Sequence, residues 1–247
     1  MKTNCFLLPV ALMALHAAAQ DQGDPKLTEI WSPVAKVVTP GAPAFSGAPS
    51  DAIVLYTSKK DSDKWLAKDG SAFKWITGEA DFTAADKAGD VKTKQSFGDC
   101  QLHIEWRTPA VVKGDGQGRG NSGIFFMSRY ELQVLDNYNN VTYSNGQAGS
   151  IYKQHIPLVN VCRPPGEWQV YDVVFTAPQF YADSMVKYPA RITVFHNGVL
   201  VQNNVAIWGA TAYIGIAKYE KHGAKEPIIL QDHGNPTSFR NIWIREL

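Results

Sequence analysis

The feature that most constrains the fold is a series of nine short runs of β-forming residues, each bounded by turn residues. Such a series is typical of the strands of a β-sandwich or jelly roll. Beyond the first 19 residues, no segment of about 11 residues or more has a clear helical period. We therefore expect an all-β chain. The predicted strands cover residues 52–56, 100–108, 123–127, 130–136, 168–177, 191–196, 199–205, 226–231 and 239–247.

One hairpin is predicted most directly. Asn197 and Gly198 separate the runs RITVFH and VLVQ. A two-residue type I′ turn requires positive φ at both central positions, and Asn-Gly supplies it at the least cost. The two runs should therefore pair as neighbouring antiparallel strands.

The first 19 residues have the pattern of a cleaved secretory signal peptide. Lys2 precedes an apolar run over residues 6–15, and Ala17, Ala18 and Ala19 form a small-residue cleavage site. A membrane anchor is the alternative, but the run is shorter than the roughly 20 residues that span a bilayer. Cys5 lies before the apolar run, so no lipoprotein cysteine stands at the cleavage point. We expect a secreted or periplasmic protein with no membrane insertion after cleavage.

The rest of the chain suits one domain. Residues 20–50 are rich in Pro, Ala and Gly and predict an irregular N-terminal arm, and residues 51–247 form the predicted β domain. The whole chain has a net charge of +1, and its basic residues are scattered. This balance offers no attraction for nucleic acid or an anionic membrane. Cys100 and Cys162 are too few for a structural zinc site, and the sequence leaves open whether they pair.

A glycine-rich stretch leads into the most distinctive strand. Residues 114–121, GDGQGRGN, precede the runs GIFFM and YELQVLD. In a strand, Glu131 and Gln133 share one face, and Leu132 and Val134 share the other. The loop is either a flexible surface loop or the rim of a groove with Arg119 and Asn121 turned toward a ligand. It lacks the pattern of a nucleotide-binding loop.

The strand at 100–108 alternates in the same way. Its apolar face carries Leu102, Ile104 and Trp106, and its polar face carries Gln101, His103, Glu105 and Arg107. The polar face is either simply exposed to solvent or meets Glu131 and Gln133 to form a sugar-sized groove.

Three side chains are candidates for acid–base chemistry: Glu105, Glu131 and His233. His233 lies in LQDHGNP at the exit of a predicted strand, where a rigid element can position a catalytic group. The alternative is a hydrogen-bonded turn histidine. The other histidines considered, His103, His196 and His222, have no metal-ligand spacing.

Five motifs resemble the 3-keto-disaccharide hydrolase family, over about residues 52–247. They are NSGIFFMSRYELQVLD (121–136), GQAGSIY (146–152), RPPGEWQVYDVVF (163–175), HNGVLVQNNV (196–205) and LQDHGNPTSFRNIWIREL (230–247). The resemblance implies a single-domain, concanavalin A-like and laminin G-like jelly-roll β-sandwich. Residues 65–90 follow the family pattern less closely, which affects only an edge of the sheet.

The resemblance also implies cleavage of glycosides whose sugar is oxidised at C3. A base removes the acidified C2 proton, the enolate expels the aglycone from C1, and water adds to give net hydrolysis. Glu131 is the leading candidate for the base, supported by Gln133, and Glu105 and His233 are candidates for proton return or metal ligation. A divalent cation, Arg or Lys would serve as the electrophile. The expected ligands of the keto oxygen and hydroxyls are Arg107, Arg119, Asn121 and Lys153.

Two other functions compete with this one. The first is a non-catalytic carbohydrate-binding module, because jelly rolls serve lectins and enzymes alike. The second is a conventional glucan hydrolase, which needs two carboxylates facing each other at roughly 5–10 Å. In each case the expected partner is an oligosaccharide or glycoside.

Overall fold

The computed structural model describes residues 23–37 and 47–247, so the predicted signal peptide lies outside the described residues. The all-β prediction is confirmed. No helix in the described part of the chain is long and apolar enough to cross a membrane. The helical elements described are the short 3-10 turns η1 (Pro25–Thr28), η2 (Lys59–Lys64), η3 (Gly116–Gly118) and η4 (Ser144–Gly146).

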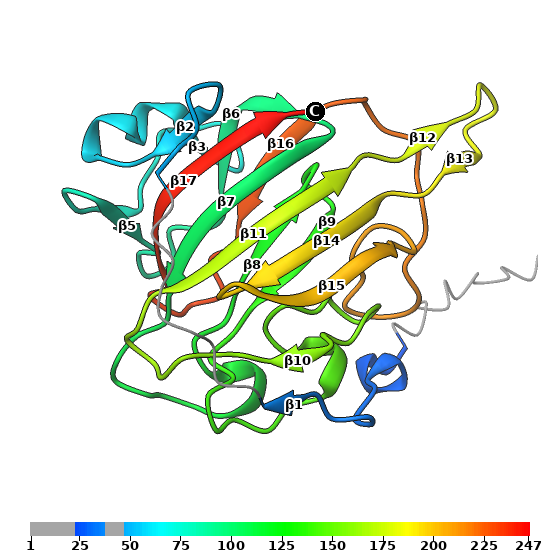
Figure 1. Cartoon of the computed structure of the whole chain (residues 1–247), viewed down its shortest axis with the longest axis horizontal. Coiled ribbons are helices and arrows are strands. Elements are labelled where there is room, and N and C mark those ends of the chain that lie inside the picture. Colours follow the sequence, from blue (N-terminus) through cyan, green and yellow to red (C-terminus); the bar gives the residue numbers. More distant parts are fainter. Residues whose placement is uncertain (1–22, 38–46) are drawn as a thin grey trace, which may run out of the picture.

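Two antiparallel sheets pack face to face as a jelly-roll β-sandwich (Figure 1). The larger sheet has the order β15-β14-β11-β7-β17-β5-β4, and β2 also pairs with β17. Its strands are β2 (Ile53–Tyr56), β4 (Ile76–Thr77), β5 (Asp81–Thr83), β7 (Cys100–Arg107), β11 (Gln169–Thr176), β14 (Arg191–His196), β15 (Val199–Ala206) and β17 (Ser238–Glu246).

The smaller sheet has the order β3-β6-β16-β8-β9. Its strands are β3 (Trp65–Ala67), β6 (Val91–Phe97), β8 (Ser122–Phe126), β9 (Tyr130–Val134) and β16 (Glu226–Leu230). Two further pairs lie outside both sheets, β1 (Lys36–Val37) with β10 (Val159–Asn160) and β12 (Gln179–Phe180) with β13 (Val186–Tyr188). All nine predicted runs form strands.

Alternation of side chains produces the core between the sheets. Leu102, Ile104 and Trp106 of β7 lie in one buried cluster with Leu132 and Val134 of β9. Because successive strand residues point to opposite faces, the polar residues between them lie on the two outer faces of the sandwich. The predicted hairpin joins β14 to β15, with φ values of 51° at Asn197 and 80° at Gly198.

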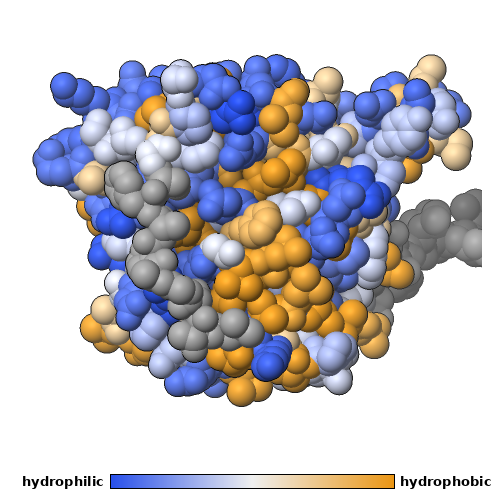
Figure 2. All heavy atoms as spheres, in the orientation of Figure 1, coloured by the Kyte–Doolittle hydropathy of each residue, from blue (hydrophilic) through white to orange (hydrophobic). Residues whose placement is uncertain are grey.

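The outer face of the larger sheet carries a band of hydrophobic side chains across its middle (Figure 2). Val174 of β11 and Phe195 of β14 are 43% and 40% exposed on the molecular surface. The strand at 100–108 therefore shares its sheet with exposed apolar side chains as well as polar ones.

The described part of the N-terminal arm is hydrogen-bonded to the domain. Asn145 Oδ1 accepts from Ile30 N at 3.0 Å, and Asn145 Nδ2 donates to Thr28 O at 3.1 Å. The side chain of Asn145 is fully buried. Strand β1 of the arm also pairs in parallel with β10. These contacts place residues 25–30 beside the loops that follow β9.

Candidate functional site

Strand β9 aims a carboxylate and an amide away from the core. Leu132 and Val134 enter the core, so Glu131 and Gln133 lie on the outer side of the smaller sheet. The free edge of β9 is closed by the segment 149–152. Gln133 N donates to Ser150 O at 3.0 Å, and Tyr152 N donates to Glu131 O at 3.2 Å. The backbone that carries Glu131 is therefore held on both sides.

The site around Glu131 is a concave pocket of about 570 Å³, within the range of sizes that hold small ligands. Side chains from β8 and β9 form its floor. Loops distant in sequence, and one residue of the N-terminal arm, form its walls. The lining residues are Glu29, Gln117, Asn121, Phe125, Glu131, Gln133, Tyr143, Tyr152, Thr211, Tyr213, Gln231 and His233.

Glu131 has an unusual electrostatic environment. Its side chain is largely buried, with 5% of the residue exposed. Burial, and secondarily the charge of Asp90, raise the pKa of the Glu131 carboxyl to about 8. A carboxylate shielded from water by burial is a stronger base than one in water, because the charged form is disfavoured. Glu131 is therefore suited to take a proton near neutral pH.

Amide side chains form a connected belt beside this carboxyl. Gln133 Nε2 donates to Gln117 Oε1 and to Asn121 Oδ1, both at 3.2 Å. Asn121 Nδ2 in turn donates to Gln117 O at 2.7 Å. Among the described residues, the buried Oε1 atoms of Gln133 and Gln231 have no hydrogen-bond partner. Both side chains line the pocket, so two unsatisfied acceptors lie in its wall.

Two tyrosines complete the polar wall. The hydroxyl oxygens of Tyr143 and Tyr152 lie 2.7 Å apart in a hydrogen bond. Burial raises the pKa of both, that of Tyr152 to about 12, so both stay protonated at neutral pH. One hydroxyl donates to the other, which leaves the second proton of the pair for a ligand oxygen.

The structure brings four of the sequence-predicted site residues together. Glu131, Gln133, Asn121 and His233 all line the pocket. His233 lies three residues after the end of β16, and Asn235, two residues further on, accepts a hydrogen bond from Gly120 N at 3.0 Å. The exit of β16 is thus tied to the glycine-rich loop.

Glu105 and Arg107 are not part of this pocket, and the prediction that the polar face of 100–108 meets Glu131 is wrong. Strand β7 lies in the other sheet, between β11 and β17. Since its apolar side chains enter the core, its polar face looks out from the opposite side of the sandwich. Arg107 there stacks over Trp168, with its guanidinium carbon 4.5 Å from the ring centroid.

Glu105 belongs to an ion-pair network on that opposite face. Its carboxylate accepts from Arg240 Nε at 2.6 Å and from Asn241 Nδ2 at 2.8 Å. Burial by itself would raise the pKa of Glu105, but hydrogen bonds from His103, Asn241 and Arg240 outweigh burial and lower it to about 2. Such a carboxylate holds its charge and is a poor base.

Arg119 and Lys153 also lie outside the pocket. Arg119 Nε donates to Asp136 Oδ2 at 2.7 Å, and Asp136 Oδ1 accepts from Tyr138 N at 3.1 Å, which is a local turn contact. Lys153 Nζ donates to the backbone oxygens of Pro25 and Tyr213, both at 2.8 Å. Both cations thus make their contacts within the protein. Arg119 holds the glycine-rich loop to Asp136, and Lys153 holds the N-terminal arm at Pro25.

Several lining residues were missed from the sequence. Gln117 lies in the glycine-rich loop and Gln231 follows β16, each two or four positions from a predicted site residue, and this closeness in sequence was the available signal. No sequence pattern marked Glu29 as a site residue, because the N-terminal arm is far in sequence from the rest of the pocket. Among the described residues, no group of three or more His, Cys, Asp and Glu is arranged to hold a metal ion. Cys100 and Cys162 are both free and buried.

The fold and pocket together define a jelly-roll protein with a concave, polar pocket on the outer side of its smaller sheet. The chain belongs to the family described as the 3-keto-alpha-glucoside-1,2-lyase-like domain, whose model matches residues 51–245. No curated protein matches the chain.

Solved structures support the same assignment. The chain is 51% identical to a protein from Parabacteroides distasonis that is provisionally named a glycosyl hydrolase, with a TM-score of 0.80 over 90% of this chain and 96% of that one. A second P. distasonis protein with the same provisional name is 18% identical, with a TM-score of 0.55 over 80% of this chain and 94% of that one. The second likeness concerns the fold alone.

Proposed function

We propose that this protein cleaves glycosides whose sugar carries a ketone at C3. One observation carries the proposal, namely a buried carboxyl, Glu131, whose pKa is raised to about 8 inside an open, polar, sugar-sized pocket. A C3 ketone acidifies the proton at C2, so a base of this strength matches the task. Membership of the lyase-like family supports the same chemistry.

The proposed reaction begins with proton transfer from C2 to the Glu131 carboxylate, which leaves an enolate with its charge on the C3 oxygen. The electron pair then forms the C1–C2 double bond and breaks the bond from C1 to the aglycone oxygen. That oxygen takes a proton from His233. In the hydration step, the oxygen of water bonds to C1 and one proton of the water returns to His233, while Glu131 gives its proton back to C2, which restores both side chains and gives net hydrolysis.

Neighbouring groups supply the remaining stabilisation. The free hydroxyl proton of the Tyr143–Tyr152 pair is a donor suited to the enolate oxygen, which gains charge in the transition state. The unpartnered oxygens of Gln133 and Gln231 are suited to accept from sugar hydroxyls and so orient C2 toward Glu131. Export across a membrane, as expected from residues 1–19, remains part of the proposal.

A carbohydrate-binding module is the second candidate function. The amide belt and the pocket tyrosines favour it, because such groups recognise sugars without reacting with them. An unpaired carboxyl with a raised pKa contributes little to binding alone and favours the enzyme.

The test uses methyl 3-keto-glucoside and its C2-deuterated form, with methyl glucoside as the unoxidised control. The proposal expects release of methanol from the keto compound alone, with a primary isotope effect on kcat/KM. Direct hydrolysis of the unoxidised glucoside would identify a conventional glycosidase. Binding without release of methanol would identify a binding module. Repeating the assay with a chelator shows whether a metal ion is required.

A further inference from the structure

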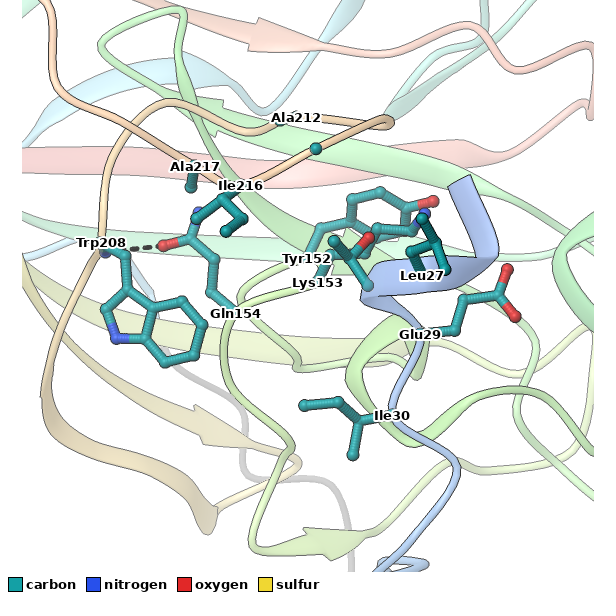
Figure 3. Close-up of a pocket in the computed structure, with 12 residues that line it drawn as sticks. Leu27, Glu29, Ile30, Tyr152, Lys153, Gln154, Trp208, Ala212, Ile216 and Ala217 are labelled. Atoms are coloured by element: carbon teal, nitrogen blue, oxygen red, sulfur yellow. Dashed lines mark hydrogen bonds between the residues drawn. The ribbon is translucent and has the colours of Figure 1, made fainter. Parts of the chain in front are cut away.

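A second cavity adjoins the Glu131 pocket. It has a volume of about 200 Å³ and shares Glu29 and Tyr152 with that pocket. Figure 3 shows Trp208 and Ile216 on one side of it and Leu27 of the N-terminal arm on the other. The family model begins at residue 51, so the arm lies outside the matched region.

The lining of this second cavity is mainly apolar. Trp208, Ile216 and Leu27 are 50%, 80% and 82% exposed, so their surfaces are free to be covered. Ile30, Ala212 and Ala217 add further apolar surface. Burying such apolar surface removes it from water, which is favourable.

Its polar side chains already have partners within the protein. Gln154 Nε2 donates to Gly209 O at 3.1 Å, and Gln154 Oε1 accepts from Trp208 N at 2.7 Å. Lys153 Nζ donates to two backbone oxygens. The Glu131 pocket differs, because the oxygens of Gln133 and Gln231 there have no partner. A second sugar unit would find few groups for its hydroxyls in the apolar cavity.

We propose that this cavity is a subsite for an apolar aglycone, the leaving group of a glycoside whose sugar ring occupies the Glu131 pocket. The inference rests on the proposed function. The size fits a single ring, because a dry cavity of about 150 Å³ holds benzene. The substrates of this chain are thus glycosides of cyclic or aromatic alcohols.

The arm is built to keep this subsite in place. Asn145 fixes the backbone of Thr28 and Ile30, and Lys153 fixes that of Pro25. Each of these contacts holds a residue within three positions of Leu27. The apolar wall is therefore a fixed part of the site.

The test compares 3-keto-glucosides with methyl and cyclohexylmethyl aglycones, which are alkanols of similar acidity. The expected kcat/KM is about tenfold or more higher for cyclohexylmethyl, from burial of the ring. Trp208→Ala and Ile216→Ser should each bring this ratio toward one. Ile76→Ser, at a 63% exposed site on β4, is the matched control and should keep the ratio. A wild-type ratio near one overturns the subsite.

A binding measurement separates this inference from the proposed function. Saturation-transfer NMR with unoxidised cyclohexylmethyl glucoside should show strong transfer to the cyclohexyl protons, lost in Trp208→Ala. If neither keto-glucoside is cleaved but this transfer is seen, the reaction is wrong and the subsite stands. If the methyl compound is cleaved and no transfer reaches the ring, the subsite is wrong and the reaction stands.

Discussion

Gly123 of β8 lies so close to Glu131 that a β-carbon at residue 123 would be 2.5 Å from Glu131 Oε1. Real β-carbons do not approach an oxygen so closely, so any other residue at this position must displace the carboxyl. The glycine therefore provides the space that the proposed base occupies. The two residues lie on paired strands, where the register fixes their relation.

Gly123→Ala should displace the Glu131 carboxyl while the chain still folds. We expect kcat/KM on methyl 3-keto-glucoside to fall by roughly 10²-fold, since misplacing a reacting group by about 1 Å costs that much. The free energy of unfolding should fall by about 1–3 kcal/mol. Gly47→Ala is the matched control, because a β-carbon there meets nothing within 4 Å. Equal activity of the two variants would contradict this role of Gly123.

The pKa of Glu131 predicts how activity depends on pH. A base must be unprotonated in the free enzyme, so the rise of kcat/KM with pH should have its midpoint near pH 8. The measurement is the pH profile of kcat/KM on methyl 3-keto-glucoside. A profile already flat from pH 5 upward would show that this carboxyl is not the titrating base.

The same shift predicts how stability depends on pH. The folded-state pKa of about 8 lies above the ordinary 4.5, so between these values the folded protein holds the proton that the unfolded chain releases. The contribution of Glu131 to the free energy of unfolding is thus complete below pH 4.5 and is lost as the pH rises toward 8. Denaturant titrations at pH 5 and 8.5 should show that the free energy of unfolding falls more between these pH values for the wild type than for Glu131→Gln. Equal falls in the free energy of unfolding for the two proteins would contradict the raised pKa of Glu131.

Glu105 should matter for stability and not for turnover. Glu105→Gln weakens its hydrogen bonds with Arg240 and His103, and we expect the free energy of unfolding to fall by about 1–3 kcal/mol at pH 7. Since its pKa is about 2 in the folded protein, its contribution is present above pH 4.5 and is lost as the pH falls toward 2. A large loss of kcat on methyl 3-keto-glucoside in the folded variant would restore Glu105 as a catalytic candidate.

The arm should loosen when its anchor is removed. Asn145→Ala deletes the hydrogen bonds to Ile30 and Thr28, so trypsin should cut after the exposed Lys26 faster than in the wild type. KM for the cyclohexylmethyl substrate should rise more than KM for the methyl one. Asn204→Ala, which removes an exposed contact with Arg191 on the larger sheet, is the control. Unchanged cleavage by trypsin would show that the arm is held by other contacts.

Much of the fold could be predicted from the sequence, because the positions of strands and of the hairpin depend on local sequence patterns. Apolar runs between turn residues marked nine strands, and Asn197-Gly198 marked a hairpin. Strand β6 was missed although it lies inside the smaller sheet. Its sequence, VKTKQSF, has Lys and Gln where an apolar run would be expected. Tertiary pairing with β3 and β16 makes it a strand.

Only part of the candidate site could be predicted from the sequence, because local sequence does not determine which sheet a strand joins. Glu131 and Gln133 were placed on one face by strand alternation alone, and the structure agrees. Glu105 was assigned to the same groove, but β7 pairs with β11 and β17 in the other sheet. No pattern within 100–108 distinguishes the two sheets. Glu29 and Tyr213 reach the pocket from loops far away in sequence.

The central claim is that Glu131 removes the C2 proton, and the most direct measurement is the turnover of Glu131→Gln on methyl 3-keto-glucoside. The substitution keeps the size of the side chain and removes the base. We expect a fall in kcat of about 10²- to 10⁴-fold, with the fold intact by circular dichroism. Glu220→Gln, at a side chain that is 71% exposed, should turn over like the wild type. Near-normal turnover by folded Glu131→Gln would show that Glu131 does not remove the C2 proton.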